Sequence, residues 1–311
     1  MQAVFNVALP VFGLILAGFF AARLKLLGGN STQALNQFVY WFALPSLLFL
    51  VMFRAPLERV VDPAFLVPFC LPLGVILLLV WIWGRLAWGL RLADLSVQSL
   101  SAIYANVGYM GIPLVLMAFG EEAMPYAIAG TILTGSIMFG LGIMGIEIDL
   151  RSSDGFFKAI FGVLKVVCRN PLMLAPALGA ALAYGDVTLP IPLKNFLELL
   201  GAASSPCALF ALGMFLAAQP LGNELPEVTW LTALKLIVAP VATFITILFL
   251  SDFNSLPAQV ALLLNALPTG AGAFVLAQQY DRLVAQTSAT ILVSTILSVP
   301  TVSLLIALFA H

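Results

Sequence analysis

The chain has 311 residues, of which 62% are hydrophobic and 9% are charged, with a formal net charge of −1. Because an average soluble domain carries about a quarter charged residues, this composition excludes an ordinary soluble protein and predicts a multi-pass membrane protein. The small net charge gives no reason to expect a nucleic-acid partner.

Ten charge-poor stretches predict membrane-spanning helices, since about 20 apolar residues cross the hydrocarbon as a helix. In the first half they are Ala3–Ala22, Gln33–Phe53, Ala64–Gly84, Leu95–Gly120 and Ala123–Ile146. In the second half they are Asn170–Gly185, Leu199–Gln219, Val228–Ser251, Leu256–Tyr280 and Leu283–Ala310. We therefore predict an all-α polytopic membrane protein with ten transmembrane helices in the lipid bilayer.

One connection is long enough to hold an element of its own, and it divides the chain in two. We predict a first half over residues 1–148, a linker over 149–169 and a second half over 170–311. The linker spaces Phe157, Ile160, Phe161 and Leu164 at helical intervals. Lys158 and Lys165 lie between them, so we interpret it as an amphipathic helix on the cytoplasmic membrane surface.

The basic residues predict the orientation. The loops after spans 1, 3, 5, 7 and 9 hold nine of the 13 Lys and Arg, and the opposite loops hold three. Because cytoplasmic loops are enriched in Lys and Arg, the odd-numbered loops are expected inside and both termini outside. We expect the bacterial inner membrane as the location.

Five spans in each half imply that any internal repeat is inverted, because an odd number of crossings starts the second half on the opposite side. "AGTILTGSIMFG" in span 5 resembles "SATILVSTILSV" in span 10, and "ALPSLLF" in span 2 resembles "SSPCALF" in span 7. The offsets are 159 from Thr131 to Thr290 and 161 from Pro45 to Pro206. These near-equal offsets favour a 5+5 inverted repeat.

The same offset pairs two poor helices. "NVGYMGIP" (Asn106–Pro113) interrupts span 4, and "NALPTGAGAF" (Asn265–Phe274) interrupts span 9. Paired interruptions in two halves point to a transporter's binding site near the bilayer midplane. Broken helices expose N–H groups whose partial positive charge favours an anion, so we predict that spans 4 and 9 cross at an anion site.

Other polar residues in the spans are weaker candidates. Lys235 in span 8 either attracts a substrate carboxylate, stabilises exposed carbonyls, or extends to the cytoplasmic interface. Hydroxyls of spans 5 and 10 either line the site or pack between helices: Thr134, Ser136, Ser294 and Thr295. Three residues of span 2 are candidates for contact with substrate from the other side: Asn36, Gln37 and Tyr40. Glu147 and Glu198 are minor candidates for proton coupling.

Four stretches together resemble the auxin efflux carrier family: "NVGYMGIPL", "ALPTGAGAFVLAQQY", "ALPSLLF" and "LKLIVAP". The resemblance covers essentially the whole chain. It implies the inverted-repeat fold of bile-acid and sodium/proton transporters, elevator-type alternating access and a scaffold of spans 1, 2, 6 and 7 that often dimerises. It assigns the crossover to Asn106, Gly108, Gly111 and Pro113, with Pro268, Thr269 and Gly270 opposite. The chain lacks an Asp or Glu within span 3, where plant members would place a proton site.

The sequence therefore predicts a secondary transporter of small mono- or dicarboxylates, auxin-like or malonate-like, with H⁺ or Na⁺ as the candidate coupling ions. No HExxH, GxSxG or phosphate-loop motif is present and the one histidine is His311, so we expect no enzyme activity and no cofactor or metal. The alternatives are a passive anion channel and a membrane receptor that moves nothing.

Overall fold

The structure is a computed structural model that describes residues 2–28, 30–54, 61–150, 169–185, 187–219 and 225–309. Within these residues the chain is helical, and its β-structure is confined to one isolated bridge between Ala105 and Thr269. Of the amphipathic linker predicted over residues 149–169, residues 151–168 lie outside the described residues.

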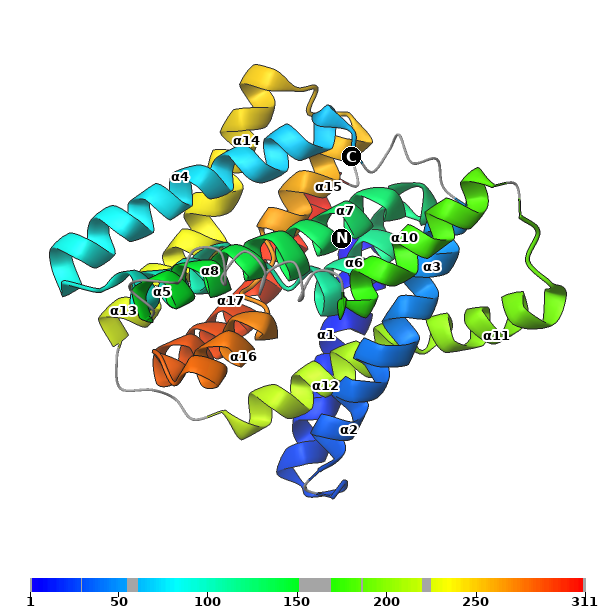
Figure 1. Cartoon of the computed structure of the whole chain (residues 1–311), viewed down its shortest axis with the longest axis horizontal. Helices are drawn as coiled ribbons and strands as arrows, with labels where there is room; N and C mark the ends of the chain where they lie inside the picture. Colours follow the sequence, from blue (N-terminus) through cyan, green and yellow to red (C-terminus); the bar gives the residue numbers. More distant parts are fainter. Residues whose placement is uncertain are drawn as a thin grey trace.

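The helices of the first half follow the predicted spans closely (Figure 1). They are α1 (Gln2–Arg23), α2 (Ser31–Phe38), α3 (Leu44–Arg54), α4 (Pro63–Trp88), α5 (Leu92–Ile103), α6 (Ile112–Phe119), α7 (Met124–Ile132) and α8 (Phe139–Leu150). Three π-helical turns and one 3₁₀ turn join some of them: η1 (Val39–Ala43), η3 (Val107–Gly111), η5 (Leu133–Met138) and the 3₁₀ turn η4 (Glu121–Ala123).

The described part of the second half is also helical. It holds α10 (Pro171–Tyr184), α11 (Ile191–Ala202), α12 (Ser204–Ala218), α13 (Leu225–Ala233), α14 (Ala239–Leu250), α15 (Leu256–Asn265), α16 (Ala271–Tyr280) and α17 (Val284–Phe309). One π-helical turn, η6 (Leu234–Val238), joins α13 to α14.

Six continuous helical stretches of the described chain are long and apolar enough to cross a membrane. They are Ser31–Arg54, Pro63–Trp88, Glu121–Leu150, Ile191–Ala218, Pro226–Leu250 and Val284–Phe309. Four shorter apolar helices accompany them: Leu9–Arg23, Val107–Phe119, Pro171–Tyr184 and Leu256–Asn265. Each predicted span overlaps one of these stretches, and the six long ones confirm a multi-pass, all-helical membrane protein.

The boundary predicted for span 7 was too short. The charge-free window began at Leu199, but the helix already starts at Ile191 and includes Lys194 and Glu198. Both side chains are exposed at this end of the molecule, where they remain solvated without ending the helix. Absence of charge therefore marks the apolar core of a span and not its helical ends.

Helices of the two halves pack in pairs: α1 lies along α12, and α3 lies along α10 (Figure 1). Glycines permit both contacts. Between α1 and α12, a Cβ added at Gly18 would lie 2.0 Å from Phe210 O, and one added at Gly213 would lie 1.9 Å from Ile15 O. Between α3 and α10, a Cβ added at Gly179 would lie 2.4 Å from Phe49 O. Such small residues allow close backbone approach between membrane helices. Figure 1 shows α3 and α10 on the right, α1 and α12 in the lower centre, and α4, α5 and α13 on the left.

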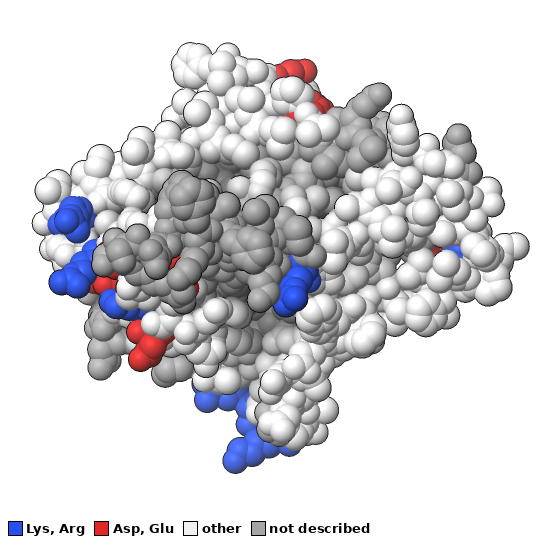
Figure 2. Space-filling model, viewed as in Figure 1, with Lys and Arg blue, Asp and Glu red and all other residues white. Residues whose placement is uncertain are grey.

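Charged residues are unevenly distributed over the visible face. Figure 2 shows Lys and Arg gathered at its left and lower edges, where α4 ends and α1 meets α2. The broken helices meet well inside the molecule, because all residues from 260 to 270 are buried. The structure thus has a polar, basic end and a deeply buried helix interruption.

Candidate functional site

The two predicted interruptions are present in the structure. Between α5 and η3 the chain leaves helical geometry at Tyr104–Asn106, and between α15 and α16 it does so over residues 266–270. Pro268 has no N–H to offer a helix, which favours the second break. Pro113 stands at the start of α6, a position where a missing N–H costs little.

The two breaks bind each other through their backbones. Asn106 N donates to Pro268 O at 2.9 Å, and Gly270 N donates to Tyr104 O at 2.8 Å. Ala105 and Thr269 pair between these bonds as the isolated antiparallel bridge. Backbone groups at membrane depth need partners within the protein, and here each broken helix satisfies groups of the other.

Side chains cap the carbonyl ends that the breaks leave. Thr269 Oγ1 donates to Ser101 O at 2.7 Å, in the last turn of α5. Lys235 Nζ donates to Asn265 O at 3.1 Å, at the last residue of α15. Both carbonyl groups belong to the four that a helix C-terminus leaves unpaired. Ser294 Oγ accepts a hydrogen bond from Thr269 N at 3.2 Å, so α17 also binds the break between α15 and α16.

Glycines are required here by close approach. A Cβ at Gly270 would lie 3.0 Å from the Tyr104 ring, and one at Gly272 would lie 2.5 Å from it. A Cβ at Gly111 would lie 2.9 Å from side-chain carbons of Leu264 and Leu267. Gly108 differs, because a Cβ there would have no heavy atom within 4 Å. Open space therefore adjoins the start of the second half-helix of span 4.

The two asparagines of the breaks have different surroundings. Asn265 is fully buried and its Nδ2 donates to Phe69 O at 3.0 Å and to Thr243 Oγ1 at 2.9 Å. Asn106 is 5% exposed, and its Nδ2 has no hydrogen-bond partner among the described residues. A buried amide that lacks a partner is uncommon in proteins. Asn106, two residues before the open side of Gly108, therefore has a donor available for a ligand.

Most predicted hydroxyls bind their own helix. Thr134 Oγ1 donates to Gly130 O at 2.7 Å, and Thr295 Oγ1 donates to Ile291 O at 2.7 Å. Ser294 is the one whose oxygen reaches the crossover backbone. The side chain of Ser136 lies outside the described part of the chain. Such bonds to the residue's own helix are common for Ser and Thr, and a role of these hydroxyls at the site stays a prediction.

The span 2 candidates lie on the other part of the molecule. Tyr40 Oη donates to Asn170 Oδ1 at 3.3 Å. Asn170 also caps α10 through Leu172 N at 2.9 Å and donates from Nδ2 to Gly135 O at 3.4 Å, in the π-turn of span 5. Asn36 is half-buried with an unpartnered Oδ1 among the described residues, and Gln37 is exposed. Tyr40 thus joins the two parts of the molecule through Asn170.

Sequence reasoning missed the π-helical turns that carry these residues. Tyr40 lies in η1, Gly108 and Gly111 in η3, Thr134 in η5 and Lys235 in η6. π-turns occur often at functional sites. A one-residue insertion in a helix leaves a uniformly apolar sequence unchanged in appearance, so no sequence pattern indicates these turns.

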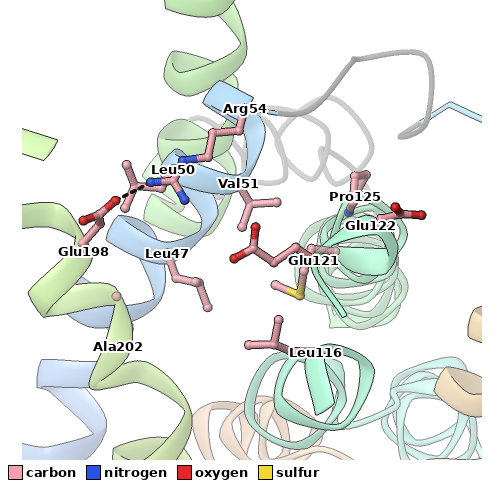
Figure 3. Close-up of a pocket in the computed structure, with 12 residues that line it drawn as sticks. Leu47, Leu50, Val51, Arg54, Leu116, Glu121, Glu122, Pro125, Glu198 and Ala202 are labelled. Carbon is pink, nitrogen blue, oxygen red and sulfur yellow. Dashed lines mark hydrogen bonds and ion pairs between the residues drawn. The ribbon is translucent and has the colours of Figure 1, made fainter. Parts of the chain in front are cut away.

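A cavity of about 420 Å³ is lined by residues of α3, α6, η4, α7 and α11 (Figure 3). Leu47, Val51 and Arg54 of α3 line one wall, and Leu116 of α6 lines another. Arg54 forms an ion pair with Glu198, while Glu121 points into the space. The cavity therefore lies between α3 and α11 on one side and α6 and η4 on the other. Glu147, the other minor candidate, accepts a hydrogen bond from Tyr280 Oη at 2.8 Å.

Comparisons with known proteins show the family of the chain. Residues 3–306 match the profile of the family described as "Membrane transport protein". A "Putative malonate transporter" of Rhizobium meliloti (strain 1021) is 31% identical over 304 residues, covering 97% of this chain and 95% of that protein.

Two more distant relatives also match over nearly the whole length of both chains. An "Uncharacterized transporter" of Methanothermobacter thermautotrophicus is 27% identical, with 93% of each chain covered. The "Uncharacterized transporter YfdV" of Escherichia coli (strain K12) is 25% identical, with 93% of this chain and 92% of that protein covered. These relatives are named as transporters and not as enzymes. The chain belongs to the membrane transport protein family, the auxin efflux carrier group that its motifs resemble.

Proposed function

We propose that the chain is a secondary transporter of small organic anions, with malonate and other short carboxylates as the first substrates to test. In this proposal the substrate is held where the breaks of spans 4 and 9 meet. The observation that carries it is the buried amide of Asn106, whose Nδ2 has no partner among the described residues. Two residues later, a Cβ added at Gly108 would meet no heavy atom within 4 Å.

The local electrostatics suit a carboxylate. The half-helices that begin at Val107 and Ala271 direct their first N–H groups toward the crossover region. A helix N-terminus carries roughly half a positive charge, and a carboxylate accepts short hydrogen bonds from amides. Asn106 and Gly270 are thus placed beside the two N-termini that would attract the substrate, and malonate is in the name of the R. meliloti relative.

The packing supports elevator-type alternating access over a 5+5 inverted repeat. Helices α1, α3, α10 and α12 pair across the two halves, as a pseudo-twofold arrangement would require. The broken helices pack mainly against α4, α8 and α13–α17, and the second half of span 4 also contacts α1 and α12 through α6 and η3. The cavity of Figure 3 lies between these two groups, where substrate would enter as one group moves against the other. Both termini would then face outward from the bacterial inner membrane. The helices α1, α3, α10 and α12 would form the contact surface of a homodimer.

The test uses the purified full chain in liposomes with radiolabelled malonate. A carrier gives saturable uptake that accelerates when the liposomes are preloaded with unlabelled malonate. Imposed proton or sodium gradients in the same assay report the coupling ion. Non-saturable conductive flux would support the channel instead, and malonate binding without flux would support the receptor. Absence of both binding and flux for malonate and a panel of short carboxylates contradicts the proposal.

A further inference from the structure

Lys235 has an unusual environment for a lysine. It is 0% exposed, and it is the one charged side chain in the buried class among the described residues. The ion pairs found in this part of the chain join Arg54 to Glu198 and Arg282 to Asp94, so neither includes Lys235. Fully buried lysines are rare unless they are paired, and ionisable residues inside membrane proteins are functional candidates.

The partner of Lys235 is a helix end. Its Nζ donates to Asn265 O at 3.1 Å, the carbonyl that terminates α15 at the crossover. A helix C-terminus carries roughly half a negative charge, so it is a favourable neighbour for a cation. The interface alternative for Lys235 does not agree with this position, since the ammonium is enclosed and not extended to the surface.

Further oxygen atoms surround the same helix end. Asn265 Oδ1 is buried without a hydrogen-bond partner in the described chain, and Asn265 Nδ2 binds Thr243 Oγ1 at 2.9 Å. Nδ2 also lies 3.5 Å from Pro68 O, a carbonyl that has no helical donor because Pro72 lacks an N–H. Backbone carbonyl, amide and hydroxyl oxygens in an enclosed space are the ligands that replace the hydration shell of alkali cations in proteins.

From this arrangement we propose that the Lys235 ammonium is a built-in counter-cation. It occupies the place that a sodium or potassium ion would otherwise fill at the end of α15, so substrate binding needs no sodium. By cancelling the negative end of α15, it leaves the two half-helix N-termini as the dominant charges at the crossover. The last point rests on the proposed function, because it assumes that the crossover holds an anion.

The first test is the cation dependence of the wild-type chain. Its thermal unfolding in detergent is measured in sodium chloride, potassium chloride and choline chloride at equal ionic strength. The expected Tm is the same in all three, since a ligand raises Tm only when it binds the folded state. A sodium-specific rise in Tm, or malonate uptake that requires sodium, overturns the proposal.

The second test replaces the tethered cation with a free one. Lys235→Ala should lower Tm by several degrees, and methylammonium chloride should restore part of the loss in a concentration-dependent manner. Lys194→Ala is the matched control, because Lys194 is exposed on α11 and should show neither effect. A Lys235→Ala protein whose Tm responds to none of methylammonium, sodium or potassium contradicts the counter-cation role.

A third comparison remains informative if the alanine variant does not fold. Lys235→Arg retains the charge and Lys235→Met removes it at similar length, so Arg should retain the greater Tm and malonate uptake. Equal Tm values for the Lys235→Arg and Lys235→Met variants would exclude a stabilising role for the positive charge at position 235. The Tm tests do not depend on the substrate, so a failure of malonate transport with intact cation rescue rejects the proposed substrate and not the counter-cation.

Discussion

The two asparagines at the helix breaks show what residue-scale geometry adds to the sequence. Asn106 and Asn265 begin matching motifs, and the sequence predicts the same role for both. In the structure the Asn265 amide is engaged with α4 and α14, whereas the Asn106 Nδ2 has no partner among the described residues. The pattern predicts where amides stand but not their partners, since those come from helices far away in the chain.

The asparagines should therefore separate stability from transport. Asn265→Ala removes the donor to Phe69 O and Thr243 Oγ1, and should cost about 1–3 kcal/mol of unfolding free energy. Asn106→Ala removes no such bond, so its Tm should stay near wild type while malonate uptake falls on the order of tenfold or more. Thermal unfolding and liposome uptake of both variants check this. Equal loss of Tm in the two variants, or unchanged uptake for Asn106→Ala, would contradict it.

At the scale of elements, the sequence predicted each helical span and both interruptions. Amide, glycine and proline clusters are visible in an apolar run because they conflict with helix formation. The π-turns at Val39, Leu133 and Leu234 were not predicted, since they consist of residues that suit an α-helix equally well. Residues that disfavour a helix can be recognised in a sequence, but a π-helical turn imposed by packing cannot.

The contact between α1 and α12 gives a prediction for one element pair. A Cβ at Gly213 would lie 1.9 Å from Ile15 O, so Gly213→Ala should push the helices apart and lower Tm by several degrees. Gly13→Ala, on the same helix pair, is the matched control because a Cβ there meets no atom within 4 Å. That change should be neutral or raise stability by about 0.5–1 kcal/mol. Similar Tm values for the two variants would reject the close packing.

At the scale of the whole molecule, composition predicted a multi-pass membrane protein, and the helices and family confirm it. Length and hydrophobicity are sufficient for that conclusion because the bilayer thickness fixes the length of a span. The sequence did not predict the cavity of Figure 3, whose lining comes from five separate elements: α3, α6, η4, α7 and α11. Orientation stays a prediction from the distribution of basic residues.

Cysteine labelling of intact cells tests that orientation. In a background where Cys70, Cys168 and Cys207 are serine, Asn254→Cys lies between α14 and α15 and Leu24→Cys lies after α1. Both positions are exposed. A membrane-impermeant thiol reagent should label position 254 before lysis and position 24 only after it. The reverse pattern would invert the topology, and labelling of both before lysis would refute a single orientation.

The crossover is joined by main-chain atoms alone where Asn106 N meets Pro268 O and Gly270 N meets Tyr104 O. Those two bonds are indifferent to the side chain at position 106. If the side chain at position 106 binds the substrate as proposed, it can change without loss of these two bonds. We therefore expect the identity of residue 106 to vary between carriers that share this backbone and differ in substrate.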